Sequence, residues 1–355
     1  MVLLFFARTS IVVLLVSVAT SLAHAARPSC DTQFVSIAEV ASPSRFESFY
    51  VEVKTETSDH RVVFFDQMKA KRGKPTLVLL NGLFVPREDL RAFRETFEAQ
   101  SKGEGLLIMH YSTQMESLAM RHHLSGDAAK NVREDMASVD FGREVAEVLK
   151  VADLRGPIVL VGYSYGGLPL ARFLELYRNG EAKLPGGRNQ IRESIFLSTL
   201  VEAVDEIPMG SVVLAGRNAV ESMMMLNPWM GGLESVKRLR GHSARSSAVG
   251  IVDGNLMGGF KLPDGVDRSA MILGLTAQIG AAADFSLRAE GKAAQPNTGA
   301  VHFLIAGGES VGRMVAQKAA AEAWGVTPEI VPDVPHHALA HKPEVLVPIL
   351  LKRLR

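Results

Sequence analysis

A serine flanked by glycines occupies a position where its hydroxyl could act as a nucleophile. Residues 162–167 read Gly-Tyr-Ser-Tyr-Gly-Gly, which contains a G-x-S-x-G pattern centred on Ser164. An apolar run at residues 158–161 precedes the pattern, and a helical pattern at residues 168–177 follows it. A sharp turn between strand and helix raises the serine hydroxyl above the sheet, and it needs glycine two residues to either side. The pattern therefore predicts a nucleophilic Ser164 and not a bystander serine in a glycine-rich turn.

This arrangement of strand, turn and helix resembles the α/β-hydrolase superfamily, over most of the chain from residue 49 to the C-terminus. In that family the nucleophile is followed along the chain by an acid and then by a histidine near the end. The resemblance implies cleavage of an acyl bond through a covalent acyl-serine, with no cofactor. The serine at the turn argues against the branches of the family that use an aspartate nucleophile.

The histidine is expected near the C-terminus. Residues 330–344 read Ile-Val-Pro-Asp-Val-Pro-His-His-Ala-Leu-Ala-His-Lys-Pro-Glu, which resembles the family's strand, short loop, histidine and helix start. The spacing to Pro343 implies His336 as the catalytic base, because a neutral imidazole can accept the serine proton near neutral pH. Pro335 replaces the glycine that is common before this histidine, so His337 is the alternative.

The acid is expected just after a late strand. Residues 301–305 are apolar and are followed by Ala-Gly-Gly-Glu-Ser, so the resemblance implies Glu309 as the acid. Aspartate is commoner at this place in the family, and glutamate is also accepted. Its task would be to hold the imidazole in one tautomer and stabilise its positive form. Glu202 and Asp205 are the alternatives, since they follow an earlier strand at residues 194–197 where some relatives carry the acid.

The developing negative charge of the reacting oxygen needs two backbone N–H donors. The resemblance implies the N–H of Tyr165, directly after the nucleophile, as one of them. The loop after residues 76–80 reads Asn-Gly-Leu-Phe and resembles the family's His-Gly-x loop, with Asn81 in place of histidine. It implies the N–H of Leu83 as the second donor.

Short apolar runs alternate with helical patterns along the chain and must position these residues. Residues 76–80, 106–110 and 158–161 are continuously apolar, which is typical of strands buried on both faces. Residues 89–99 and 140–152 show a helical apolar stripe. The sequence therefore predicts an α/β fold with a mostly parallel central sheet and helices on both faces, preceded by an antiparallel pair at residues 49–53 and 61–65.

The alternation of strands and helices stops between residues 201 and 297. This stretch contains Met223-Met224-Met225 and several glycines, and we interpret it as an inserted, mainly helical cap. The hydrolase core would then comprise residues 26–200 and 298–355. The methionines could pack a helix onto the core or line an apolar acyl pocket, and the sequence leaves both open.

The N-terminus resembles a signal peptide over residues 1–25. Arg8 precedes an apolar run at residues 11–18, and Ala23-His24-Ala25 offers the small-x-small pattern before a cleavage site. The expected location is secreted or periplasmic, with no stable membrane span after cleavage. An uncleaved anchor is the alternative. The chain has one cysteine, Cys30, so an intramolecular disulfide is excluded.

The composition and the absence of certain motifs exclude some classes of binding partner. The 355 residues include 39 Lys and Arg against 38 Asp and Glu, a net charge of +1 that gives no reason to expect a nucleic-acid partner. No phosphate-loop, C-x-x-C or H-E-x-x-H motif is present, so neither a bound cofactor nor a metal is expected.

The sequence therefore predicts a carboxylic-ester hydrolase acting on a small-molecule ester or acyl substrate, with the oligomeric state left open. A lipase, thioesterase, amidase or acyltransferase would use the same three residues, because the fold does not decide the substrate. A non-catalytic hydrolase-like binding domain is the alternative of another class.

Overall fold

The computed structural model describes a defined part of the chain, namely residues 31–37, 45–54, 60–83, 85–133, 136–152, 154, 156–187, 190–201, 244–245, 248–253, 261–283, 285–293, 299–309 and 311–355. The expected signal peptide at residues 1–25 lies outside these residues. So do residues 202–243 of the expected cap.

One sheet of nine strands forms the centre of the described structure, in the order β1-β2-β3-β5-β4-β6-β7-β8-β9. The strands are β1 (Asp31–Ile37), β2 (Glu47–Lys54), β3 (His60–Met68), β4 (Thr76–Leu80), β5 (Gly105–His110), β6 (Ile158–Tyr163), β7 (Ile191–Leu197), β8 (Ala300–Ala306) and β9 (Glu329–Val331).

The strands from β5 to β9 in this order pair parallel with one another. Strands β1, β2 and β3 pair antiparallel, and β3 joins β5 antiparallel. The predicted mostly parallel sheet with an early antiparallel pair is therefore confirmed.

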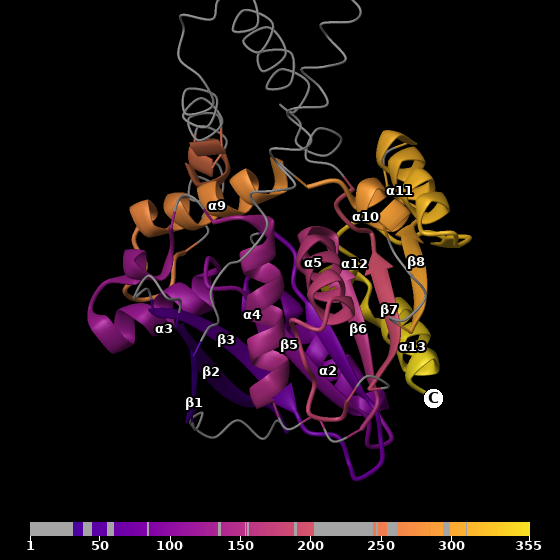
Figure 1. Ribbon diagram of the computed structural model, residues 1–355, viewed down its shortest axis with the longest axis horizontal. Helices are drawn as coiled ribbons and strands as arrows, with labels where there is room; N and C mark the ends of the chain where they lie inside the picture. Colours follow the sequence, from indigo (N-terminus) through magenta and orange to yellow (C-terminus); the bar gives the residue numbers. More distant parts are fainter. Residues whose placement is uncertain are drawn as a thin grey trace, which may run out of the picture.

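Helices cover both faces of the sheet, as predicted (Figure 1). Helices α4 and α5 pack together on one face, and α2 and α13 pack together on the other. The α-helices are α2 (Arg91–Gln100), α3 (Met115–Ser125), α4 (Ser138–Val151), α5 (Gly167–Arg178), α9 (Arg268–Ala283), α10 (Leu287–Ala293), α11 (Val311–Ala323), α12 (Ala338–His341) and α13 (Pro343–Leu354).

Strand β4 shows why its sequence is apolar at every central position. Leu77 and Leu79 belong to the core that includes α2 and α13, while Val78 and Leu80 belong to the core that includes α4 and α5. Successive side chains of a strand point to opposite faces, so a strand covered on both sides has no position for a polar residue facing water. All four side chains are fully buried.

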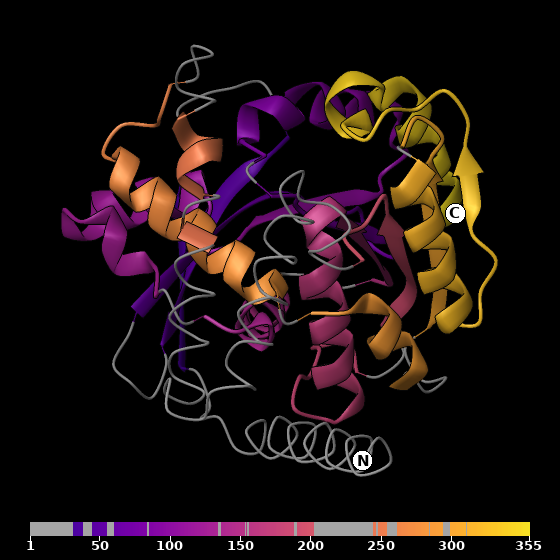
Figure 2. The same ribbon diagram turned by 90° about the horizontal axis from the view of Figure 1, so that it is seen from above.

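The carboxyl ends of the parallel strands meet at one edge of the sheet, where α9 and α10 lie (Figure 1). Gln278 of α9 donates from Nε2 to Thr113 Oγ1 after β5 at 2.6 Å, and Leu287 N of α10 donates to Val201 O after β7 at 2.9 Å. Figure 2 looks onto this edge from above and shows α5 between α9 and α10. Side chains projecting from the strand ends therefore converge beneath these two helices.

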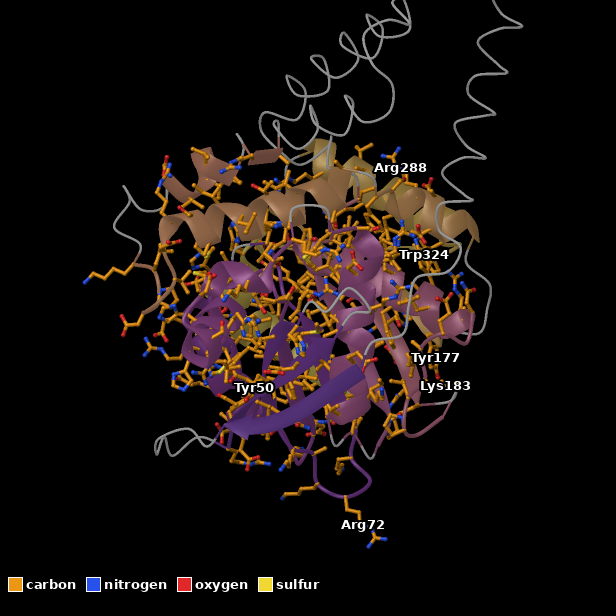
Figure 3. All side chains as sticks on the ribbon, turned by 60° about the vertical axis from the view of Figure 1, so that its left-hand side comes forward. Tyr50, Arg72, Tyr177, Lys183, Arg288 and Trp324 are labelled. Carbon is orange, nitrogen blue, oxygen red and sulfur yellow. The ribbon has the colours of Figure 1, made fainter. Side chains whose placement is uncertain are left out.

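Labelled side chains mark the two ends of the sheet in Figure 3. Arg72, in the connection from β3 to β4, projects from the end opposite α9, whereas Arg288 of α10 and Trp324, directly after α11, lie toward the other end. The Trp324 indole donates to Leu287 O at 2.9 Å and so joins the end of α11 to α10. Helices α9 and α10 both lie within the predicted cap region. No helix in the described part of the chain is long and apolar enough to cross a membrane.

Candidate active site

Ser164 lies in a sharp turn between β6 and α5. It starts a 3₁₀ turn (Ser164–Gly166) and has a φ of 52°, in the left-handed region that residues with a Cβ rarely adopt. The segment after β7 holds this conformation, because Leu200 N and Thr199 Oγ1 donate to Ser164 O at 2.9 and 3.2 Å. The backbone strain at Ser164 is therefore stabilised by contacts from a neighbouring strand.

The glycines of the G-x-S-x-G pattern are required by backbone that approaches closely. A Cβ at Gly162 would lie 2.7 Å from Gly166 O, and a Cβ at Gly166 would overlap Leu80 O at the end of β4. The turn thus leaves room for no side chain at either position. The sequence pattern predicted both glycines, but the need for Gly167 emerges only from the fold, since a Cβ there would overlap the side chain of Thr199.

His336 lies against Ser164 although 172 residues separate them. It belongs to the loop between β9 and α12, and its Nε2 lies 2.9 Å from Ser164 Oγ. Tyr163 donates from its hydroxyl to His336 O at 2.9 Å, so the residue before the serine also fixes the backbone of the histidine. Burial raises the pKa of the Tyr163 phenol, which keeps it protonated and able to donate. Nothing in the sequence pattern pointed to this contact.

Glu309 contacts the other nitrogen of the same imidazole. Its Oε1 lies 2.6 Å from His336 Nδ1, and its side chain is 1% exposed. A carboxylate at this distance favours the tautomer that carries its proton on Nδ1, which leaves Nε2 free to accept a proton from the serine. Glu309 Oε2 lies 3.9 Å from Arg313 Nη1 of α11.

Backbone hydrogen bonds fix the loop of Glu309 to the loop of His336. Gly307 N donates to Val331 O at 2.8 Å, and Gly308 N donates to Val334 O at 2.9 Å. A Cβ added at Gly307 would lie 2.9 Å from Val331 O, and a Cβ added at Gly308 would lie 3.0 Å from Val334 O. Both distances are too short for a side chain to be accommodated without a shift. The two glycines before Glu309 therefore allow the two loops to approach, and the approach brings the carboxylate to the imidazole.

The alternative residues are placed differently. The ring of His337 packs edge-on against the ring of His336, with centroids 5.1 Å apart, and it is His336 whose ring nitrogen lies at hydrogen-bonding distance from Ser164. Desolvation of its ring lowers the pKa of His337, and electrostatic interactions with the neighbouring His336 and His341 lower it further. Glu202 and Asp205 lie outside the described residues.

The two expected oxyanion donors lie in the segments that follow two neighbouring strands, β4 and β6. Leu80, the last residue of β4, pairs with Gly162 of β6, so the loop after β4 lies beside the serine turn. Tyr165 is in the first turn of the helical segment, where backbone N–H groups have no partner within the helix. Its side chain is buried against Tyr111 and Phe141, which raises the pKa of the phenol well above its ordinary value and leaves the ring an apolar anchor.

Side-chain amides hold the loop after β4. Asn81 accepts from Gly82 N at 2.9 Å and donates to Val85 O at 2.8 Å, and Gln114 donates from Nε2 to Gly82 O at 2.6 Å. Leu83, next to this anchored glycine, is half-buried. The sequence pointed to Asn81 through its likeness to the family's loop, whereas nothing in it pointed to Gln114.

Within the described residues, no group of three or more His, Cys, Asp or Glu side chains is arranged to hold a metal ion. The contacts described above instead form a line of proton donors and acceptors from Ser164 through His336 to Glu309. Such a line can activate a hydroxyl as a nucleophile.

Comparison with solved structures identifies the fold. A peroxisomal alpha-beta-hydrolase from Saccharomyces cerevisiae matches with a TM-score of 0.52 at 13% identity, covering 92% of this chain and 89% of that one. One of the carboxylesterases of Nitrososphaera gargenis matches with a TM-score of 0.50 at 11% identity, covering 91% and 97%. E-2-(Acetamidomethylene)succinate hydrolase matches with a TM-score of 0.50 at 11% identity, covering 91% and 99%.

The chain thus has the α/β-hydrolase fold, as the sequence predicted. No protein-family model matches it, and no curated protein matches it in sequence. At these identities the likeness describes the backbone alone, and the chemistry must be argued from the side chains of this chain.

Gly166→Ala tests the turn. Its Cβ would overlap Leu80 O, which is backbone and cannot rotate away, so we expect a loss of about 3 kcal/mol or more of unfolding free energy. Gly280→Ala is the matched control. Gly280 lies in α9, and a Cβ there would have no atom within 4 Å, so alanine should add up to about 1 kcal/mol. Urea denaturation followed by circular dichroism measures both, and equal stabilities would contradict the steric argument.

Proposed function

We propose that this protein is a serine hydrolase that cleaves carboxylic esters. One observation carries the proposal: the unbroken line of contacts from Ser164 Oγ to His336 Nε2 at 2.9 Å, and from His336 Nδ1 to Glu309 Oε1 at 2.6 Å. Three side chains from distant parts of the chain lie at hydrogen-bonding distance in the order that nucleophile, base and orienting acid require. The strained φ of Ser164 supports the same role, since such strain gathers at functional residues.

In the first half of the reaction, Ser164 Oγ attacks the carbonyl carbon of the ester while His336 Nε2 takes the hydroxyl proton. The carbonyl oxygen becomes negative and accepts hydrogen bonds from the N–H groups of Tyr165 and Leu83. His336 then gives its proton to the departing alkoxide. The ester C–O bond breaks, an alcohol leaves, and an acyl-serine remains.

In the second half, water takes the place of the alcohol. The water oxygen attacks the acyl carbon while His336 accepts a proton from the water. His336 then returns that proton to Ser164 Oγ as the carboxylic acid is released. Glu309 keeps the Nδ1 proton in place and stabilises the imidazolium in both halves. The enzyme ends each cycle unchanged.

Thioesters, amides and transfer of the acyl group to another acceptor would pass through the same acyl-serine. The fold does not choose between these acyl compounds. Esters are the class proposed for the first test, since a carboxylesterase is among the structures that share this fold. Enzymes with these three residues can be lipases, thioesterases, amidases or acyltransferases. They differ from one another in the contacts that they make to the acyl chain and to the acceptor, and Ser164, His336 and Glu309 do not determine those contacts. A non-catalytic binding domain would have no need for the strained Ser164 or for the buried carboxylate of Glu309.

Replacing the nucleophile tests the proposal. We expect Ser164→Ala to lower kcat/KM for p-nitrophenyl esters by about 10⁴-fold or more and to abolish labelling by a fluorophosphonate. Ser125→Ala is the control, since this exposed serine lies at the end of α3. A series from acetate to long acyl chains separates an esterase from a lipase. A folded wild-type protein that neither turns over any acyl substrate nor labels would show that the proposal is wrong.

Paired substitutions assign the base and the acid. His336→Gln should match the loss in Ser164→Ala, and His337→Gln should stay within about threefold of the wild type. Glu309→Gln should lower kcat by about 10²- to 10⁴-fold, because the amide would favour the wrong tautomer of the imidazole. Glu202→Gln and Asp205→Asn serve as controls for the acid. A large loss in either of them with Glu309→Gln unaffected would move the acid to the segment after β7.

We further propose that the protein acts outside the cytoplasm, on the signal-like pattern of residues 1–25. Intact-mass measurement of the protein recovered from a secreting host should show a chain that begins at Ala26. A full-length mass in the membrane fraction would instead indicate a retained anchor.

A further inference from the structure

The peptide unit between Gly82 and Leu83 accepts a hydrogen bond from a side chain of another loop. Gln114 follows β5 and precedes α3, and its Nε2 donates to Gly82 O at 2.6 Å. Its Oε1 accepts from Tyr111 N at 3.0 Å. A carbonyl oxygen can only accept and a backbone N–H can only donate, so these two partners determine the orientation of the amide.

The hydrogen bond to Gly82 O also determines the direction in which the N–H of Leu83 points. The carbonyl of Gly82 and the N–H of Leu83 belong to one planar peptide unit, and the described chain contains no cis peptide bond. In a trans peptide the C=O and the N–H point in opposite directions. A hydrogen bond that fixes the oxygen on one side therefore fixes the direction of the N–H on the other.

The other anchor of this loop leaves that peptide free to rotate. Asn81 holds Gly82 N and Val85 O, which belong to the peptide units before and beyond the Gly82–Leu83 unit. Among the described residues, the hydrogen bond to Gly82 O comes from Gln114. Glycine has no Cβ to restrict its backbone, so Gly82 needs such an external contact to keep one orientation.

Gln114 is placed to give a rigid contact. Its side chain is buried, with 3% of the residue exposed, so water does not compete for Gly82 O. Its own backbone N–H donates to Tyr111 O at 2.8 Å, which ties it to the end of β5. Strand β5 is the parallel neighbour of β4, from which the loop of Gly82 emerges. The amide thus connects the ends of two adjacent strands.

We propose that Gln114 is a positioning residue that aims the Leu83 N–H at the negatively charged oxygen of the reacting substrate. The inference rests on the proposed serine-hydrolase function, in which Leu83 supplies one of two oxyanion donors. Gln114 touches neither substrate nor Ser164 in this role and acts through the orientation of one peptide unit. A donor that is correctly oriented before the reaction stabilises the transition state more than the bound substrate.

Two substitutions at this position test the proposal. Gln114→Met keeps the length of the side chain and removes both hydrogen bonds. Gln114→Glu keeps the acceptor for Tyr111 N but places a carboxylate oxygen against Gly82 O, which should turn the peptide away. We expect kcat/KM to fall about 10- to 100-fold in the methionine variant and further in the glutamate variant, with KM within about twofold of the wild type.

A transition-state analogue separates positioning from general damage to the structure. A trifluoromethyl ketone adds Ser164 Oγ to its carbonyl carbon and leaves a negative oxygen where the oxyanion donors point. Its inhibition constant should rise by the same factor as kcat/KM falls in each Gln114 variant. A purely structural role would reduce the amount of active enzyme and leave the inhibition constant of the remaining enzyme unchanged.

Gln190 provides the matched control. It is also a buried glutamine with 6% exposure, and it accepts from Gly186 N at 2.8 Å and donates to Gly156 O at 3.2 Å. It lies just before β7, at the opposite end of the sheet from Ser164. Gln190→Met should cost a similar amount of stability, while kcat/KM and the inhibition constant should remain within about twofold of the wild type.

The outcomes separate this proposal from the proposed function. Wild-type protein without Ser164-dependent turnover would remove the function and this role together. Ser164-dependent turnover with kcat/KM and the inhibition constant unchanged in folded Gln114 variants would overturn the role of Gln114 alone. A rise in KM with kcat unchanged would also overturn it, by indicating a role in substrate binding. If the methionine variant fails to fold, the glutamate variant decides, because it retains the bond to Tyr111.

Discussion

The left-handed turn at Ser164 is the constraint on which the rest of the site depends. A residue with a Cβ adopts a φ of 52° at a cost of about 1 to 2 kcal/mol, so the surroundings must hold it there. Leu200 and Thr199 bind its carbonyl from the segment after β7, and Gly166 packs directly against the end of β4. The contacts that hold the turn thus come from the end of β4 and from the segment after β7, the strands on either side of β6. The conformation of Ser164 is therefore a property of the assembled sheet.

Parallel strands explain how residues far apart in the sequence meet at this turn. The carboxyl ends of parallel strands lie along one edge, so each loop that leaves such a strand opens onto the same region. The loop after β4 brings Gly82, the loop after β8 brings Glu309, and the loop after β9 brings His336. Hydrogen bonds between these loops, such as those of Gly307 and Gly308, then set the final distances. The parallel strands thus bring the loops of these residues close together, and the hydrogen bonds between the loops align their side chains.

Much of this alignment comes from buried polar side chains outside the row of Ser164, His336 and Glu309. Tyr163 holds the backbone of His336, and Gln114 holds the carbonyl of Gly82. Each contact is short and mostly shielded from water, where a hydrogen bond is stronger and an unpaired group is costly. In the proposed reaction such groups would hold the site rigid before substrate arrives, which is the condition under which fixed dipoles stabilise a transition state. The fold is shared by enzymes of many kinds, so these side chains, together with the substrate-binding surface, decide what this chain does.

The sequence by itself determined the elements and their order. The continuous apolar runs of β4, β5 and β6 predicted buried parallel strands, and the pattern of Gly162, Ser164 and Gly166 predicted the turn, because both signals are carried by residues that stand close together in the chain. Only the tertiary structure decided which side chains meet. It placed His336 against Ser164 with His337 turned aside, brought Glu309 to the imidazole, and revealed the parts of Thr199 and Gln114. Contacts between residues far apart in the chain leave no periodic pattern in a single sequence, so their partners become visible only when the strands lie side by side.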